Sequence, residues 1–411
     1  MINFEKFTLA NGLRVIVHCD TATPIVAMNI LYDVGARDEH PEQTGFAHLF
    51  EHLMFGGSVN IPKYDVPLQK VGGENNAFTN NDITNYYLTL PKPNLETAFW
   101  LESDRMLSLA FSKKSLDVQR NVVSEEFKQS YLNQPYGDVW LLLKPLAYKV
   151  HPYQWNTIGK DISHIQNATM KDVKDFFKKF YCPNNAIMVV AGDVTTAEIK
   201  KFSEKWFGKI PKGPANKRKL PVEPVQKQAQ QHTVKRKVPF DAIYKAYHCC
   251  ARSDKEFYAT DLLSDVLSNG RSSRLFRELL MRKRLFSEIN AYSSGDVDKG
   301  LFIVSGKLIK GVKMKDAENA IQLELEKVQQ NIRENELEKV KNKVESTLVF
   351  SEMNVLNKAM NLAFAELMGG AGLINSEINR YRSVTKEQIM EQAKIIFMKT
   401  NCSTLYYYSR K

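Results

Sequence analysis

Two histidines and a glutamate in the N-terminal part of the chain have the spacing of a metal site. Residues 45–57, GFAHLFEHLMFGG, contain the pattern H-x-x-E-H, formed by His48, Glu51 and His52. The apolar residues between them favour a helix. Positions i and i+4 of a helix lie on one face, so both imidazoles can bind the same ion. Glu51 lies beside them and can accept a proton from water that a zinc ion has made acidic. This pattern predicts a hydrolytic metal centre.

The alternative is that two histidines share a helix face by chance. The chain has only eight histidines. Placing two of them with a carboxylate on an apolar helix is costly without a metal, because buried polar groups need partners. The sequence therefore favours the metal site.

A hydrolytic zinc ion needs a third protein ligand and an open coordination position. Glu125 and Glu126 are candidates, because they follow Val122 and Val123 in a predicted helix. Adjacent helical residues point about 100° apart, so only one carboxylate can face the ion. The spacing leaves open which one it is, and a solvated acidic face of the helix is the other interpretation.

The elements that must position these residues form two similar halves. A chain of 411 residues is too long for one hydrophobic core, and its composition is that of a globular protein. In each half the pattern predicts strands, helices, a pair of strands, two long helices, and finally a helix and a strand. We predict an α+β protein of two homologous domains with mostly antiparallel sheets, residues 1–207 with the metal site and residues 239–411 without one. Two unrelated α+β domains are the alternative.

Residues 208–238 are predicted to be a linker that is rich in proline and basic residues. They contain nine basic residues against one acidic residue, Glu223, and so carry eight of the eleven net positive charges. This composition is typical of an extended segment that is sensitive to proteolysis. Because the excess charge is confined to this segment and no recognisable module accompanies it, we expect no nucleic-acid partner.

The remaining composition bears on location. The five cysteines are scattered and form no C-x-x-C pair, so neither a disulfide framework nor a zinc ribbon is indicated. The N-terminal residues do not have the pattern of a secretory signal, and no apolar run approaches the ~18 residues that a membrane span needs. We expect a cytoplasmic protein without a membrane span.

The order of several motifs resembles that of the pitrilysin and insulinase family of zinc peptidases, whose inverted motif is H-x-x-E-H. The similarity covers nearly the whole chain and is strongest to the short-chain branch, which includes the mitochondrial processing peptidase β-subunit and bacterial relatives. The matching segments include Gly35–Glu39, the H-x-x-E-H block, Gly72–Thr79, Asn121–Glu126, His151–Tyr153, Tyr181–Asn185 and Gly270–Phe276. The resemblance implies the fold of one half of a clamshell-like metallopeptidase.

The resemblance also implies roles for particular residues. It selects Glu126 as the third zinc ligand, with Glu51 as general base. The family binds its peptide substrate as an added strand at a sheet edge, and Asn76 and Ala77 match that edge, although Asn76 is also a common turn residue. Gln119 stands where the family has a glutamate. The exchange keeps a hydrogen-bonding group but removes a charge, and so predicts lower activity.

The C-terminal half departs from the family pattern. Met281 and Glu288 stand where active members carry an arginine and a tyrosine that hold the substrate, while Arg282 and Tyr292 lie one and four residues away. Family enzymes close a chamber with two such halves. We therefore expect a zinc endopeptidase subunit that forms a heterodimer with a related subunit carrying the Arg/Tyr pair. A non-catalytic scaffold or assembly subunit of the same fold is the alternative.

Overall fold

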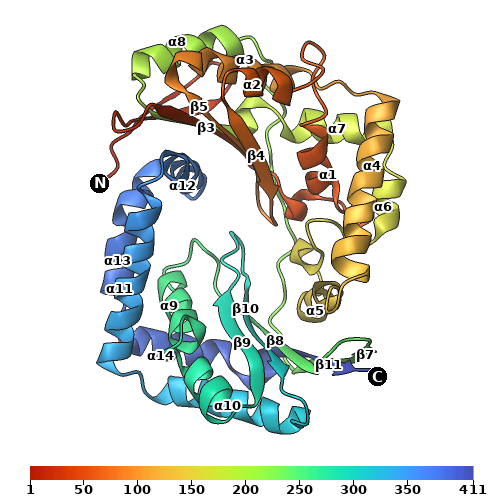
Figure 1. Ribbon diagram of the computed structural model, residues 1–411, viewed down its shortest axis with the longest axis vertical. Coiled ribbons are helices and arrows are strands. Elements are labelled where there is room, and N and C mark those ends of the chain that lie inside the picture. The colour runs from red at the N-terminus through yellow and green to blue at the C-terminus, as the bar shows by residue number, and fades with distance from the viewer. Residues whose placement is uncertain (411) are drawn as a thin grey trace. The chain divides into compact units, whose positions relative to one another are not determined.

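The computed structural model describes residues 1–410 and divides them into two compact units (Figure 1). Unit 1 comprises residues 1–128, 155–220 and 349–376, and the remaining described residues form unit 2. The contiguous domains that we expected, 1–207 and 239–411, differ from these units. Each half of the chain contributes one segment to the unit built mainly from the other half.

Unit 1 contains a six-stranded sheet with the order β1-β2-β6-β3-β5-β4. The strands are β1 (Glu5–Thr8), β2 (Arg14–Cys19), β3 (Ile25–Tyr32), β4 (Glu74–Thr79), β5 (Thr84–Pro91) and β6 (Ala186–Gly192). β6 is buried along its whole length, which explains its continuous apolar sequence. Among the described residues β4 pairs only with β5 and therefore forms an edge of the sheet.

Unit 2 contains a five-stranded sheet with the order β7-β11-β8-β10-β9. The strands are β7 (Gln230–Arg236), β8 (Ala242–His248), β9 (Phe286–Ser293), β10 (Leu301–Leu308) and β11 (Cys402–Ser409). When β1 is left aside, the two sheets have the same strand order: β2-β6-β3-β5-β4 in unit 1 corresponds strand by strand to β7-β11-β8-β10-β9 in unit 2. β2 pairs in parallel with β6, and β7 pairs in parallel with β11, while all the other strand pairs are antiparallel. The prediction of an α+β protein whose two domains share one topology is confirmed.

Helices cover the sheet of unit 1. They are α1 (Phe46–Leu53), α2 (Asp65–Lys70), α3 (Leu95–Leu107), α4 (Lys113–Phe127), α6 (Ile162–Gln166), α7 (Met170–Phe180), α8 (Thr196–Phe207) and α12 (Val355–Leu367). α12 comes from the C-terminal half of the chain but packs on β3 and β6. Its small residues Ala359 and Ala363 are fully buried there, which lets the helix approach the strands closely.

Unit 2 repeats this arrangement. Its helices are α5 (Val139–Ala147), α9 (Phe257–Ser268), a π-helix (Phe276–Arg282), α10 (Met314–Gln330), α11 (Glu334–Ser351), α13 (Glu377–Ser383) and α14 (Lys386–Ile396). α5 comes from the N-terminal half and packs on β8 and β11. Because α5 and α12 have equivalent places in the order of elements, the two halves have exchanged the same helix.

The predicted linker, residues 208–238, is only partly a linker. β7 lies inside it and belongs to the sheet of unit 2, where it pairs with β11. Residues 211–229 form no helix or strand. None of the helices within residues 1–410 has the length and apolar character needed to cross a membrane.

Charged contacts hold the irregular part of this segment. In unit 1, Arg218 donates from Nε to Asp38 Oδ1 at 2.7 Å and from Nη2 to Asp33 Oδ1 at 2.9 Å. In unit 2, the Glu223 carboxylate accepts hydrogen bonds of 2.7 to 3.0 Å from three consecutive backbone N–H groups, those of residues 149–151. The single acidic residue of the basic stretch is thus an anchor.

Candidate metal centre

Helix α1 begins where the chain makes a turn that only glycine adopts easily. Gly45 precedes the helix with a φ of 91°, and a Cβ added there would lie 2.6 Å from the carbonyl oxygen of Ile158. In the helix, Leu49, Phe50 and Leu53 are buried. This orientation leaves His48 and His52 partly exposed on the other face, one turn apart.

The carboxylate of Glu39 holds the N-terminus of this helix. Its two oxygens accept hydrogen bonds from the backbone N–H groups of Gly45 and Ala47, both at 2.8 Å. A negative charge at a helix N-terminus is favourable, because the first N–H groups have no partner inside the helix. Burial raises the pKa of the Glu39 carboxyl, and the two N–H donors oppose that rise. His48 follows Ala47 directly, so Glu39 helps to fix where its imidazole lies.

The third member of the site comes from α4. Glu126 Oε1 lies 3.6 Å from His48 Nε2, and Glu126 Oε2 lies 3.3 Å from His52 Nε2. The two imidazole rings are 4.9 Å apart between centroids, with their planes at 89°. One ligand atom from each of the three residues lies within 4.8 Å of the others. The structure therefore brings together the three residues that the sequence and the resemblance selected.

The neighbouring glutamate points elsewhere. Glu125 pairs with Lys128 at 2.7 Å, and its side chain is 61% exposed, against 41% for that of Glu126. The ambiguity that spacing alone left open is therefore absent from the folded chain, because α4 turns only one of the two carboxylates toward α1.

The protonation states of the cluster suit a metal ion. Burial lowers the pKa of His48, and the hydrogen bond with His52 lowers the pKa of Glu126. Both directions favour the deprotonated groups that act as ligands. His48 Nδ1 is buried and has no hydrogen-bond partner among residues 1–410. Two imidazole nitrogens and one carboxylate are the donor set of a catalytic zinc site, so the residues present fit that ion.

Glu51 lies on α1 between the two histidines. Its residue is half-buried, and its negative charge acts to raise the pKa of His48. No hydrogen bond or ion pair within residues 1–410 engages its carboxylate, so the group is available to accept a proton.

The predicted substrate-binding residues lie on the edge strand. Asn76 and Ala77 belong to β4, opposite Tyr87 and Tyr86 of β5, and α1 packs against β4. Asn76 is exposed, and its side-chain oxygen accepts a hydrogen bond of 2.8 Å from the Ala77 N–H. The structure thus places these residues at a free sheet edge next to the helix that carries the histidines.

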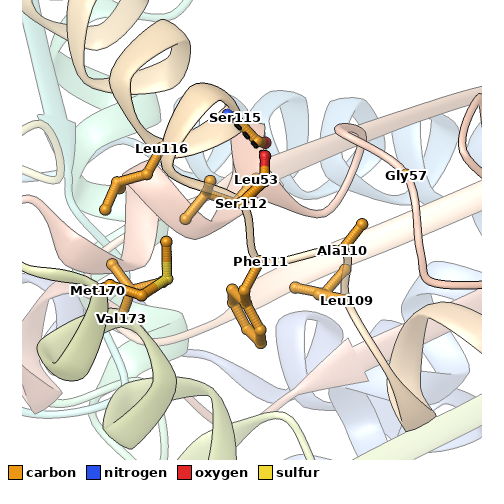
Figure 2. Close-up of a pocket in the computed structure, with 10 residues that line it drawn as sticks. All are labelled: Leu53, Gly57, Leu109, Ala110, Phe111, Ser112, Ser115, Leu116, Met170 and Val173. Atoms are coloured by element: carbon orange, nitrogen blue, oxygen red, sulfur yellow. Dashed lines mark hydrogen bonds between the residues drawn. The ribbon is translucent and has the colours of Figure 1, made fainter.

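A small cavity lies at the junction of α1, α4 and α7 (Figure 2). Its walls include Leu53 of α1, Leu116 of α4 and Val173 of α7, and Ser112 accepts a hydrogen bond from the Ser115 N–H at the start of α4. The volume is about 10 Å³, which is room for at most one water molecule. The two helices that carry the ligands are therefore closely packed, and this cavity is no substrate site.

A buried ion pair behind α1 was not predicted from the sequence. Arg105 is 2% exposed, pairs with Glu102 at 2.7 Å and lies 4.4 Å from the ring centroid of Tyr86. The Tyr86 hydroxyl in turn donates to the backbone oxygen of Phe50 in α1 at 3.2 Å. The signal that could have revealed it is a charged pair three residues apart on the apolar helix α3.

The residues that we expected to depart from the family pattern lie in unit 2. Met281 is 58% exposed at the end of the π-helix. Glu288 lies on β9 and pairs with Lys307 at 2.9 Å, while Arg282 pairs with Glu278 at 3.1 Å. Tyr292 also lies on β9, and burial raises its pKa to about 12.

Comparison with protein families gives two adjacent matches. Residues 14–154 match the family described as insulinase (peptidase family M16), and residues 167–344 match the peptidase M16 inactive domain. The first match includes the H-x-x-E-H segment and Glu126.

Individual relatives agree with these matches. Zinc protease PqqE of Helicobacter pylori is 33% identical over 82% of this chain and 77% of its own length. The uncharacterized zinc protease YmxG of Bacillus subtilis is 25% identical over 96% of this chain and 95% of its own. A probable β-subunit of the mitochondrial-processing peptidase of Arabidopsis thaliana is 23% identical over 83% of this chain and 66% of its own.

Solved structures show the same fold. A protease from Helicobacter pylori has a TM-score of 0.93 and 28% sequence identity, and the match covers 99% of this chain and 100% of that one. Pitrilysin has a TM-score of 0.77 and 20% identity, and the match covers 99% of this chain but 45% of pitrilysin.

Proposed function

Because the chain belongs to the insulinase (M16) family of peptidases, we propose that it is the metal-bearing subunit of a zinc endopeptidase. The observation that carries the proposal is the convergence of His48, His52 and Glu126, with the unpaired carboxylate of Glu51 on the same helix. Several relatives are named zinc proteases, and the donor set here suits that ion. His48, His52 and Glu126 would hold the zinc.

A bound zinc ion supplies Lewis acidity, which makes water acidic enough to act as a nucleophile near neutral pH. Glu51, whose carboxylate has no partner among residues 1–410, would take up a proton from the attacking water. As the C–N bond breaks, Glu51 returns a proton to the departing amine. Its carboxylate is thereby restored for the next cycle.

The substrate is proposed to be a peptide in extended conformation. Within residues 1–410, β4 is an edge strand that pairs only with β5, and a peptide can add to such an edge through main-chain hydrogen bonds. Asn76 and Ala77 would provide part of this contact. A substrate that uses the Ala77 N–H must first displace the side-chain oxygen of Asn76.

The partner is proposed to be a related subunit that carries the arginine and tyrosine missing here. Glu288 cannot replace a tyrosine hydroxyl that donates to a developing oxyanion, because a carboxylate is negative and accepts hydrogen bonds instead. Some relatives are named as subunits of the mitochondrial-processing peptidase, which supports a division of labour between chains.

The substitution Glu51→Gln tests the mechanism. Glutamine cannot accept the proton, so we expect zinc to remain bound while peptide hydrolysis falls by about 10²–10⁴-fold. Zinc content and hydrolysis of a peptide library, measured in the presence of co-expressed relatives, give the two readouts. Glu125→Gln is the matched control, since its carboxylate pairs with Lys128 and should leave both unchanged. If the unmodified chain hydrolyses no peptide under any of these conditions, it is a scaffold subunit.

A further inference from the structure

A cavity of about 310 Å³ lies in unit 2 beside α10, near the lower end of the roughly 300–1,000 Å³ that small-molecule sites occupy. Its walls come from the loop before the π-helix, the π-helix itself, the end of α10 and the start of α11. Gly270–Phe276, a segment that matches the family pattern but has no part in the proposed metal chemistry, comprises part of this loop and the first residue of the π-helix. Ser272 and Arg274 of this segment line the cavity.

The lining contains more basic than acidic side chains. Each of its three carboxylates already has a partner: Glu278 pairs with Arg282 at 3.1 Å, Glu324 with Lys327 at 2.6 Å and Glu336 with Arg274 at 2.8 Å. Two further arginines, Arg277 and Arg333, line the same cavity and are exposed. Neither guanidinium forms an ion pair within residues 1–410. The cavity therefore carries two surplus positive charges.

A third basic group intensifies this imbalance. Lys339 Nζ donates to Ser272 Oγ at 3.1 Å. Burial lowers the pKa of Lys339, the positive charges of Lys343 and Arg277 add to that effect, and the carboxylates of Glu336 and Asp265 oppose it. Lys339 thus lies close enough to Arg277 and Lys343 to feel their positive charges, and an anion bound beside Ser272 would interact favourably with all three.

We propose that this cavity binds a phosphate group, either as the free ion or as a phosphate ester, with Arg277 and Arg333 as its principal ligands. Two unpaired guanidinium groups match the double negative charge of a phosphate, whereas a single peptide carboxylate would neutralise only one. Guanidinium groups also bind phosphate oxygens in a bidentate manner. The side-chain amide of Gln330 adds further N–H donors on the same wall.

The experiment uses the full chain loaded with zinc and titrates it with inorganic phosphate, pyrophosphate and adenosine monophosphate by isothermal calorimetry at constant ionic strength. Sulfate and an oligoglutamate peptide are titrated in parallel. We expect saturable binding of the phosphate compounds that weakens at least tenfold in Arg277→Ala and in Arg333→Ala, because each change removes charge-assisted hydrogen bonds. Lys283→Ala is the matched control, since Lys283 is exposed and close in sequence but does not line the cavity.

The results separate the possible sources of the anion. If inorganic phosphate binds as tightly as adenosine monophosphate, the site is one for the free ion. If the nucleotide binds more tightly, the site is one for a phosphate ester. Three results would overturn the proposal: no binding by the unmodified chain, equal loss in Lys283→Ala, or preference for oligoglutamate, which would make this face a docking surface for acidic protein. Thermal melting of each variant checks that it is folded.

Discussion

Glu125 and Glu126 are adjacent in α4, yet their carboxylates have different surroundings. Glu126 faces two imidazoles, while Glu125 forms an exposed pair with Lys128. Exposed pairs contribute about 0–1 kcal/mol, so the loss of the Glu125 charge should matter little. A carboxylate ligand has no equivalent in a glutamine side chain, whose amide oxygen is a weaker donor to zinc.

At this scale we predict that Glu126→Gln weakens zinc binding by more than the roughly 10–100-fold that loss of an outer contact costs. Competition with a chelator of known affinity measures the change. Glu125→Gln should bind zinc as the unmodified chain does. If Glu125→Gln loses zinc while Glu126→Gln keeps normal zinc affinity, the third ligand is Glu125 and the assignment to Glu126 is wrong.

At the scale of elements, the orientation of α1 depends on a residue outside the helix. Glu39 accepts from two N–H groups at the start of α1, directly before His48. In Glu39→Gln one acceptor becomes an NH₂ group, which must face an N–H donor. We predict zinc affinity about 10–100-fold lower, the cost typical of a group that orients a ligand. The chelator competition assay measures it, and Glu42→Gln, an exposed neighbour, is the control.

A merely structural role for Glu39 predicts a different result. In that case Glu39→Gln would lower the melting temperature of the metal-free protein while its zinc affinity stayed normal. Measuring both quantities on the same preparation distinguishes positioning of His48 from general stabilisation.

The exchanged helix α5 gives a prediction about pH. His248 of β8 contacts the backbone oxygen of Ala147 at the end of α5 through Nε2, at 3.0 Å. Burial lowers the pKa of His248 below its ordinary value of 6.5. Because the pKa of His248 is lower in the folded chain, the unfolded chain takes up the proton first as the pH falls. The contribution of neutral His248 to the free energy of unfolding is therefore lost as the pH falls below about 6.5. The melting temperature should therefore fall less between pH 7.5 and pH 5.5 in His248→Asn than in the unmodified chain. Equal slopes would contradict this assignment.

At the scale of the whole molecule, this chain has the fold of about half of pitrilysin and of the whole of a protease from Helicobacter pylori. It covers 45% of pitrilysin while nearly all of its own residues match. We predict that the isolated chain binds zinc but hydrolyses peptides poorly, because the resemblance implies that Met281 and Glu288 stand in place of a pair that holds substrate. Adding a relative with the Arg/Tyr pair should restore turnover, measured as kcat/KM on an unstructured peptide. Full activity of the chain alone would refute the heterodimer and direct attention to Arg282 and Tyr292.

The sequence by itself determined the local chemistry and the class of fold. The spacing of His48, Glu51 and His52 predicts one face of a helix whatever the rest of the chain does, because helical periodicity is local. The alternation of strand and helix patterns, repeated in each half, was sufficient to predict two α+β domains of one topology. The resemblance, rather than the spacing, selected Glu126 over Glu125.

Only the tertiary structure decided which parts of the chain pack together. α5 and α12 are apolar helices in either half, and nothing in their sequences states on which sheet they pack. β7 and Glu223 lie in a stretch whose prolines and charges are typical of a linker. Nevertheless β7 pairs with β11, and the Glu223 carboxylate accepts hydrogen bonds from three backbone N–H groups. Glu39 contacts α1 only because a turn at Gly45 brings the helix back to it. Such contacts join residues far apart along the chain or across a turn, so they depend on the packing of complete elements and not on local periodicity.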